Sequence, residues 1–178
     1  SMKCLGIDPG LRITGYGCIR GTGPELVEAG VLRLKTELGG ERIPIADRLL
    51  ELHQDISGLL ERLTPDVVGV EAVFSHYKHP ATAIAMGHAR GVILLAVRAA
   101  GVRLVELKPN EIKKFLTGNG HASKEQMQGA VQSRLRLAER PEPPDVADAI
   151  AIAMCVGSRG GDRAEPIFAA PSRRSAQR

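Results

Sequence analysis

Four acidic residues in this chain stand where a carboxylate could bind a metal ion: Asp8, Glu71, Asp145 and Asp148. Each of the first two follows a short apolar run, and the last two are three residues apart in an otherwise apolar segment. Carboxylates are rarely buried unless they are paired or bound to a metal. If folding brings the four together, their mutual repulsion calls for divalent cations. Two such ions in one site would suit the hydrolysis of a phosphodiester.

Simpler interpretations exist for two of these acids. Asp8 precedes Pro9-Gly10 and could serve only as a turn residue. Asp145 follows Pro144 and could be a helix cap, a position that aspartate favours. Asp148 and Glu71 are harder to explain in this way, because both stand among apolar neighbours.

The elements that must position these acids alternate between strands and helices. Strands are expected at residues 3–9, 14–20, 25–35, 66–71 and 102–107. Helices are expected at about 42–63, 80–100, 109–116, 124–137 and 145–157. The first three strands suggest an antiparallel meander, and strands separated by helices imply parallel pairing with right-handed crossovers. The predicted fold is therefore α/β, with a mixed five-stranded sheet covered by helices on both faces.

This arrangement can bring the acids together. If the strands that end at Asp8 and Glu71 are parallel neighbours, both carboxylates emerge at one edge of the sheet. Asp145 and Asp148 occupy positions i and i+3 of a helix, so their side chains are neighbours on one face. Mg²⁺ suits such a site, because it binds carboxylate oxygens and also bridges to substrate phosphates.

Length and composition indicate one domain, residues 2–157, followed by a basic and disordered tail, residues 158–178. The tail carries five arginines against two acids, a net +3 of the chain's formal +4. The three cysteines fall in apolar segments and are odd in number, which favours buried thiols in a reducing compartment. We expect no membrane-spanning run and no signal peptide, and therefore a cytoplasmic protein.

Several motifs occur in the order typical of one family. The chain opens with Gly6-Ile7-Asp8-Pro9-Gly10 and Thr14-Gly15-Tyr16-Gly17, and continues with Glu71-Ala72-Val73-Phe74. It then contains Gly87-His88-Ala89-Arg90-Gly91-Val92, a basic stretch from Glu111 to Lys124, and Asp145-Val146-Ala147-Asp148-Ala149-Ile150-Ala151. Together these closely resemble the bacterial crossover (Holliday) junction endodeoxyribonucleases, the RuvC family. The resemblance covers nearly the whole chain.

The resemblance implies a ribonuclease-H-like fold and a homodimer that resolves four-way DNA junctions by paired symmetric nicks, in recombination and repair. It also implies two Mg²⁺ ions per active site, with Mn²⁺ as a substitute. The family's four carboxylates correspond to Asp8, Glu71, Asp145 and Asp148. Some relatives have His at the position of Asp145, whereas here the site is entirely carboxylate. The family further implies a branch-migration motor and a junction-binding subunit as partners.

The resemblance assigns roles to other residues as well. Lys113 and Lys124 are implied to be catalytically important, and stabilising charge at the scissile phosphate is a role that suits them. Phe74 is implied to stack on junction bases. Arg12 and Lys114 are candidate contacts to the DNA backbone.

Small residues also recur every four positions in the segment 80–100, at Ala83, Gly87 and Gly91, and at Ala81, Ala85 and Ala89. They could serve a dimer interface or packing on the protein's own sheet.

Two competing functions follow from the same residues. A non-catalytic junction-binding scaffold should have lost a carboxylate, and all four are present. An actin-like ATPase is suggested loosely by residues 6–10 and Thr14-Gly15, but that fold needs two such domains and a second phosphate loop.

Overall fold

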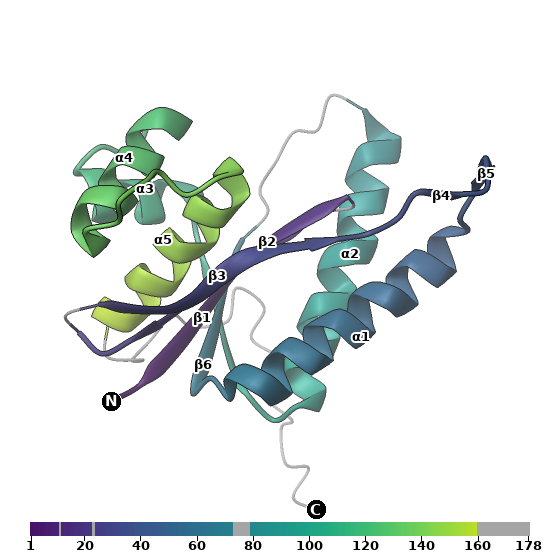
Figure 1. Cartoon of the computed structure of the whole chain (residues 1–178), viewed down its shortest axis with the longest axis horizontal. Coiled ribbons are helices and arrows are strands. Elements are labelled where there is room, and N and C mark those ends of the chain that lie inside the picture. Colours follow the sequence, from purple (N-terminus) through teal and green to yellow (C-terminus); the bar gives the residue numbers. More distant parts are fainter. Residues whose placement is uncertain (11, 23, 73–78, 160–178) are drawn as a thin grey trace, which may run out of the picture.

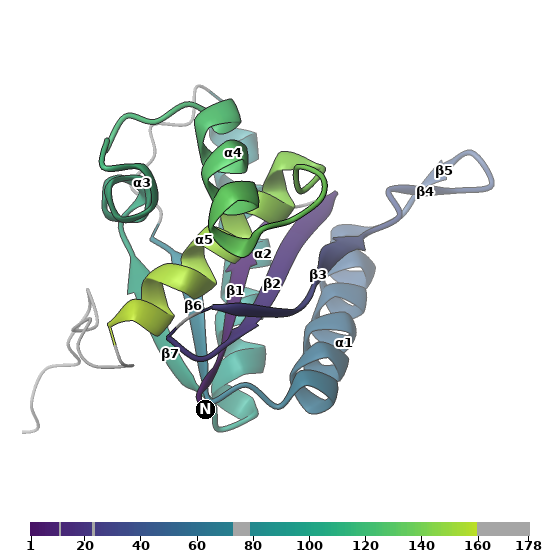
Figure 2. The ribbon, with the colours of Figure 1, turned by 60° about the vertical axis from the view of Figure 1, so that its left-hand side comes forward.

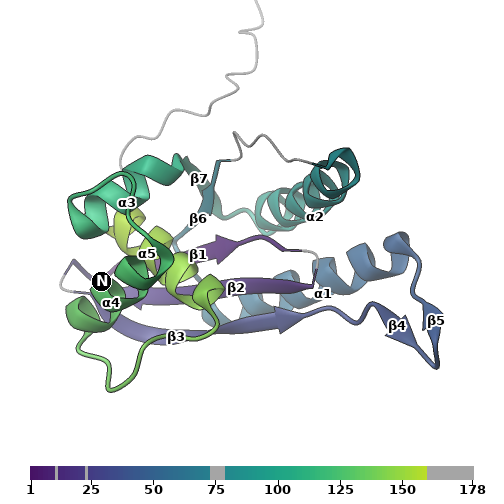
Figure 3. The ribbon, with the colours of Figure 1, turned by 90° about the horizontal axis from the view of Figure 1, so that it is seen from above.

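The computed structural model describes residues 1–10, 12–22, 24–72 and 79–159. Its centre is a five-stranded sheet with the strand order β3-β2-β1-β6-β7. Helices α1 and α2 cover one face of this sheet, and α3, α4 and α5 cover the other (Figure 1). Seen from above, the sheet lies between these two helical layers (Figure 3).

The strands and helices have the following bounds. The strands of the main sheet are β1 (Lys3–Asp8), β2 (Ile13–Arg20), β3 (Glu25–Arg33), β6 (Val67–Glu71) and β7 (Arg103–Leu107). A second, two-stranded sheet consists of β4 (Glu37–Leu38) and β5 (Glu41–Arg42). The helices are α1 (Ile45–Leu63), α2 (Pro80–Ala99), α3 (Pro109–Thr117), α4 (Lys124–Leu135) and α5 (Pro144–Ser158).

The pairing of the strands confirms the predicted α/β fold. Strands β1, β2 and β3 form an antiparallel meander. The ladders β1–β6 and β6–β7 are parallel, as helical crossovers require. A mixed sheet of this kind brings the ends of β1 and β6 to the same edge.

Some element boundaries differ from the sequence prediction. The helix expected from 42 begins at Ile45, because Glu41 and Arg42 pair with Glu37 and Leu38 in the β4–β5 hairpin. This hairpin projects away from the sheet (Figure 2). Helix α4 ends at Leu135 because Arg136 adopts a left-handed conformation, with φ of 53°. Ser158 still belongs to α5, and the remainder of the expected tail from 160 lies outside the described residues.

Each face of the sheet has its own apolar core. Leu5, Ile7, Val68 and Val70 point toward α1 and α2, whereas their neighbours Cys4 and Val67 point toward the layer of α5. The alternation follows from the two-residue period of a strand. All three cysteines are buried and unpaired, as expected from their apolar surroundings.

A row of glycines crosses the middle of the sheet. Gly6 of β1 pairs with Gly17 of β2 on one side and with Gly69 of β6 on the other. Helix α5 lies directly on this row (Figure 2). A Cβ atom built on Gly17 would lie 2.6 Å from Ile150 Cγ1, and one on Gly69 would lie 2.6 Å from Val156 Cγ2. The row therefore lets the helix approach the strand backbones more closely than any side chain would allow.

Gly6 is the most constrained member of this row. A Cβ atom there would overlap the main-chain oxygen of Ala149 and would lie 2.7 Å from the main-chain nitrogen of Ala153. Neither backbone atom can move without displacing α5 itself. The position of this helix on the sheet thus depends on the absence of a side chain at residue 6.

Helix α2 differs from the expectation that no segment is long and apolar enough to span a membrane. By length and composition alone it passes that test, because its many Ala, Gly and Ile/Leu/Val residues outweigh a few polar ones. Only 22% of its most apolar window is buried in the protein. One face packs on the sheet and α1 through Ala89, Ile93 and Val97, while Ile84 and Leu95 are 63% and 62% exposed. An uncovered apolar face of this kind is typical of a surface that meets a partner.

Replacing Gly6 by alanine should destabilise the protein by about 2–4 kcal/mol, because the new methyl group meets backbone that can shift only with the whole helix. Thermal unfolding measures this effect as a fall of the transition midpoint by several degrees.

The matched control is Gly58→Ala in α1, where a Cβ atom meets nothing within 4 Å. That change should leave stability equal or slightly higher, since alanine has the better helix propensity. Equal transition midpoints for the two variants would contradict the tight seating of α5.

Candidate active site

Asp8 and Glu71 are the last residues of two parallel neighbouring strands, β1 and β6. The ladder between these strands ends at the pair Ile7–Val70, one residue before each acid. Because parallel strands end at the same edge of a sheet, the two carboxyl groups emerge side by side there. Both side chains are half-buried. The parallel pairing of β1 and β6 is the condition under which the sequence analysis expected these two carboxylates at one edge of the sheet.

Helix α5 brings the other two acids to the same edge. Asp145 lies in its first turn and Asp148 follows one turn later, and both are half-buried. Gly15, the β2 partner of Asp8, lies beneath the main chain of Asp145, so that a Cβ atom at residue 15 would overlap the Asp145 carbonyl group. The start of α5 is thereby held directly over the end of β1.

The pKa of Asp8 reflects its burial first and the neighbouring acids second. Burial raises this pKa from its ordinary value to about 8, and the charges of Asp148, Glu71 and Asp145 contribute to the rise in that order. Lys124 acts in the opposite direction. A carboxyl group with such a pKa is only partly ionised at neutral pH in the absence of a cation.

Glu71 and Asp148 are perturbed in the same sense. Burial is the main cause of the raised pKa of Glu71, followed by the charge of Asp148, while Lys113 and Arg90 counteract it. Burial also raises the pKa of Asp148, which Lys124 and Lys113 lower and Asp145 raises. The three carboxyl groups therefore share one electrostatic environment that disfavours their simultaneous ionisation.

This donor set fits a hard divalent cation, because carboxylate oxygens are the ligands that Mg²⁺ prefers. Across the described parts of the chain, however, no three His, Cys, Asp or Glu side chains are arranged so that they could already hold an ion. The acids are thus close enough to perturb one another but not drawn together into a chelating set. Mutual repulsion of like charges explains a spacing of this kind.

The simpler interpretations of Asp8 and Asp145 find no support in the local geometry. The turn after Asp8 is held by buried Thr14, whose hydroxyl group donates to the Gly10 carbonyl (3.1 Å) and accepts from the Gly10 amide (3.3 Å). The N-cap of α5 is Pro143, and no side chain caps that helix end. Asp8 is therefore not what holds the turn, and Asp145 is not the cap of α5.

A cavity of about 210 Å³ opens beside the acids, between α5 and the pair α3–α4. Glu71 and Asp148 line it, and so do Lys113 of α3 and Lys124 of α4. The two predicted lysines thus share this cavity with two of the four acids. A phosphate group that entered this cavity would meet both positive charges.

Local contacts fix the helices that carry these lysines. Lys124 is the first residue of α4, whose N-cap is Ser123. The Ser123 hydroxyl group accepts a hydrogen bond from the Gln126 amide (3.1 Å). Arg134 of α4 donates to the Phe115 carbonyl of α3 (3.1 Å) and lies 5.1 Å from the centre of the Phe115 ring. These contacts set the distance between α3 and α4, and with it the separation of Lys113 and Lys124.

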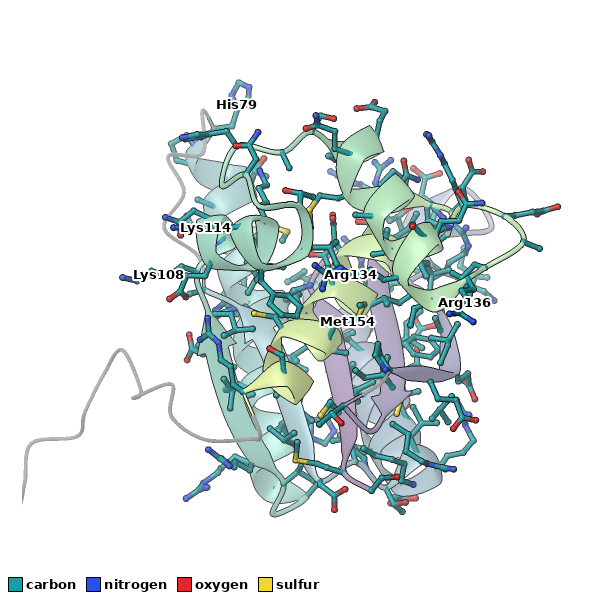
Figure 4. The ribbon with its side chains drawn as sticks, turned by 90° about the vertical axis from the view of Figure 1, so that its left-hand side faces the viewer. His79, Lys108, Lys114, Arg134, Arg136 and Met154 are labelled. Atoms are coloured by element: carbon teal, nitrogen blue, oxygen red, sulfur yellow. The ribbon has the colours of Figure 1, made fainter. Side chains whose placement is uncertain are left out.

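The remaining predicted residues lie elsewhere. Lys114 is exposed, lies on the same side of the molecule as Lys108 (Figure 4), and does not line the cavity beside the acids. Arg12 is exposed and lines a second cavity of about 600 Å³, to which Arg42 and Arg48 also contribute. Phe74 lies outside the described residues. The roles of Arg12, Lys114 and Phe74 in DNA binding stay predictions.

Sequence reasoning missed three groups of residues that build the site. Thr14, Arg90 and the glycines beneath α5 appeared in the sequence analysis only as members of family motifs, with no structural role given to them. Arg90 of α2 donates to the Glu71 carbonyl and to Glu106 of β7, each at 2.5 Å. A charged residue within an apolar helix was the available signal for it.

Comparison with known proteins agrees with this arrangement. Residues 4–156 match the family model described as crossover junction endodeoxyribonuclease RuvC. A RuvC protein of Rhodopirellula baltica is 48% identical over 158 residues, which cover 87% of this chain and 86% of that protein. One of Chloroflexus aggregans is 43% identical over 154 residues, covering 86% and 92%.

Solved structures show the same fold. RuvC of T. thermophilus, in complex with a Holliday junction substrate, superposes with a TM-score of 0.77 at 30% identity, covering 90% of this chain and 96% of that one. The yeast mitochondrial Holliday junction resolvase Ydc2 superposes with a TM-score of 0.63 at 15% identity, covering 88% and 79%, which shows the shared fold alone. With its ribonuclease-H-like sheet and a family match across nearly its whole length, the chain belongs to the RuvC family of crossover junction endodeoxyribonucleases, which are metal-dependent nucleases.

Proposed function

We propose that this protein resolves four-way DNA junctions by paired symmetric nicks, and that Asp8, Glu71, Asp145 and Asp148 form its metal-binding catalytic site. The observation that carries the proposal is the convergence of four half-buried carboxyl groups from β1, β6 and α5, with the pKa of Asp8 raised to about 8. Retention of all four acids argues against a junction-binding scaffold without activity.

The carboxylate set is suited to two Mg²⁺ ions, with Mn²⁺ as a substitute, which would supply an activated water and neutralise charge on the leaving 3′ oxygen. Lys113 and Lys124 line the same cavity as Glu71 and Asp148. Their role is to hold the scissile phosphate over the carboxylates and to oppose the negative charge that grows there during hydrolysis. Arg12, Lys114 and Phe74 are assigned to DNA contacts outside this centre.

Two symmetric nicks require two active sites, so we assign the exposed face of α2 to a homodimer interface. Ile84 and Leu95 are both more than 60% exposed on this face, and Gly87 and Gly91 beside them are open to solvent. Small and apolar residues on one face allow two helices to approach closely. The small residues of α2 thus divide between the two interpretations. Ala89 is buried and packs on the protein's own sheet, whereas Gly87 and Gly91 are exposed and leave room for a partner helix.

The proposal extends to the protein's surroundings. As in its family, we expect the protein to act in the cytoplasm on recombination and repair intermediates, beside a branch-migration motor and a junction-binding subunit. The target DNA is expected to be the four-way junction itself, as the complex of the T. thermophilus relative with a Holliday junction substrate suggests.

Asp148→Asn should reduce the cleavage rate of a synthetic four-way junction by at least about a hundredfold, because one charged ligand is lost from the catalytic centre. Binding of the uncut junction in EDTA should remain equal or become slightly tighter, since a negative charge has been removed. A denaturing gel measures cleavage, and a gel shift measures binding. The exposed Glu61→Gln variant is the control, and nicking at the normal rate by Asp148→Asn would refute the site.

Asp8→Asn should stabilise the metal-free protein at alkaline pH. Because the pKa of Asp8 is about 8 in the folded protein, above its unfolded value, the folded state keeps a proton that the unfolded state has lost. Wild-type stability should therefore fall as the pH rises from about 4 to 8. The asparagine variant avoids this loss and should gain on the order of 1–3 kcal/mol at pH 9 in EDTA.

Thermal unfolding of both proteins at pH 5 and pH 9, with EDTA or with Mg²⁺, measures this difference. Saturating Mg²⁺ should stabilise the wild-type protein more than the variant. Glu61→Gln, which removes an exposed acid, should show no such pattern. A variant that is less stable than the wild-type protein at pH 9 in EDTA would contradict the repulsion among the acids.

Leu95→Glu should weaken the dimer by more than about tenfold, because it places a charge in the apolar centre of the interface assigned to α2. Sedimentation or light scattering at several protein concentrations measures the dimer–monomer equilibrium. Leu50→Glu is the matched control, because Leu50 is 57% exposed on α1. An unchanged equilibrium in Leu95→Glu, or an equal shift in both variants, would move the interface elsewhere.

A further inference from the structure

Arg90 connects helix α2 to the strand that carries Glu71. Its Nη1 atom donates to the main-chain oxygen of Glu71 at 2.5 Å, and its Nη2 atom donates to Glu106 Oε2 at 2.5 Å. The Arg90 and Glu106 side chains are only 13% and 25% exposed. A guanidinium group is always charged and offers several donors in a fixed plane, so it can hold both acceptors at once.

Arg90 approaches Glu71 from behind the sheet. Glu106 is the β7 partner of Val70, and Val70 belongs to the core beneath α1 and α2. Glu71 pairs with Leu107, which belongs to the opposite core beneath α3 and α5. Side chains alternate between faces along a strand, so the Glu71 carboxyl group points to the acidic cavity while Arg90 holds its backbone on the other face.

The contact occurs where the sheet stops supporting Glu71. The β1–β6 ladder ends at Ile7–Val70, so on that side the Glu71 carbonyl lies beyond the last paired residues. On the β7 side, the Ala72 amide still donates to the Leu107 carbonyl at 2.7 Å. Arg90 thus supplies the second anchor for a strand end that would otherwise be held from one side only.

We propose that Arg90 is a positioning residue of the active site: by holding the Glu71 carbonyl from behind the sheet, it fixes the strand end from which the Glu71 carboxylate reaches the metal. The inference rests on the proposed role of Glu71 as a ligand. It extends that role to a residue which touches neither metal nor substrate. Because Arg90 lies on α2, it also joins the helix assigned to the dimer interface to the catalytic edge of the sheet.

The electrostatic effect of Arg90 acts in the same direction. Its positive charge is one of two that counteract the raised pKa of Glu71, together with Lys113. Glu106 balances this charge, so that the guanidinium group remains paired in its half-buried position. The ion pair and the carbonyl contact are separable by mutation.

The test compares two variants that differ only in residue 90. Glu106→Gln removes the ion pair and keeps the contact between Arg90 and the Glu71 carbonyl. Arg90→Met combined with Glu106→Gln removes both contacts and leaves no unpaired charge behind. Calorimetric titration with Mn²⁺, at a temperature where circular dichroism shows both proteins folded, measures metal affinity. The double variant should bind Mn²⁺ about tenfold more weakly than Glu106→Gln, as is common when a supporting contact of a ligand is lost.

Arg90→Lys combined with Glu106→Gln should give an intermediate affinity, because one ammonium group can still reach the carbonyl. It also keeps the test decisive if the methionine variant fails to fold. Equal Mn²⁺ affinity for Glu106→Gln alone and for both double variants would overturn the positioning role. Glu71→Gln separates the two proposals: if this variant binds Mn²⁺ like the wild-type protein, the proposed ligand set fails as well.

Discussion

The close seating of α5 on a glycine-lined sheet is the constraint on which the rest of the structure depends. Gly6, Gly17 and Gly69 form one row across three strands, and backbone and side-chain atoms of α5 occupy the space that their side chains would fill. An ordinary helix packs on a sheet through interdigitating side chains and stands further away. Here the shorter separation lets short aspartate side chains at the start of the helix reach the ends of β1 and β6.

The same seating places like charges together, which opposes stable folding. Burial and neighbouring acids raise the pKa of Asp8, Glu71 and Asp148 above the ordinary range of a carboxyl group. Lys113 and Lys124 relieve this repulsion only in part. Strained electrostatics of this kind are characteristic of functional sites, where a cation or substrate completes the balance of charge. The surrounding core must supply the stability that the site itself lacks.

The two faces of the sheet carry different tasks. The face covered by α3, α4 and α5 contains the acids, the lysines and the cavity between them, and Figure 4 shows this side of the molecule. The other face carries α2, whose outer residues Ile84 and Leu95 remain uncovered. Arg90 reaches from α2 into the end of β6 and contacts the main chain of Glu71. The sheet edge that carries the acids is therefore contacted from the layer that also presents the apolar surface.

The amino-acid sequence by itself determined the order of the main elements and the mixed five-stranded sheet, and it singled out the four acids as candidates, because hydrophobic period and strand-end position are local properties. It also placed Lys113 and Lys124 beside the acids through a family resemblance. It did not reveal the β4–β5 hairpin, since two-residue strands are too short to show a period.

Only the tertiary structure decided how the glycines, Thr14 and Arg90 serve the site. Gly6 and Arg90 act through atoms far away in the chain: Gly6 through the backbone of Ala149, and Arg90 through the carbonyl of Glu71. The meaning of an absent side chain or of a charge in an apolar helix depends on what lies opposite it in space. Sequence spacing cannot supply that information, because such contacts join elements that pack together only once the sheet and its two helical layers have formed.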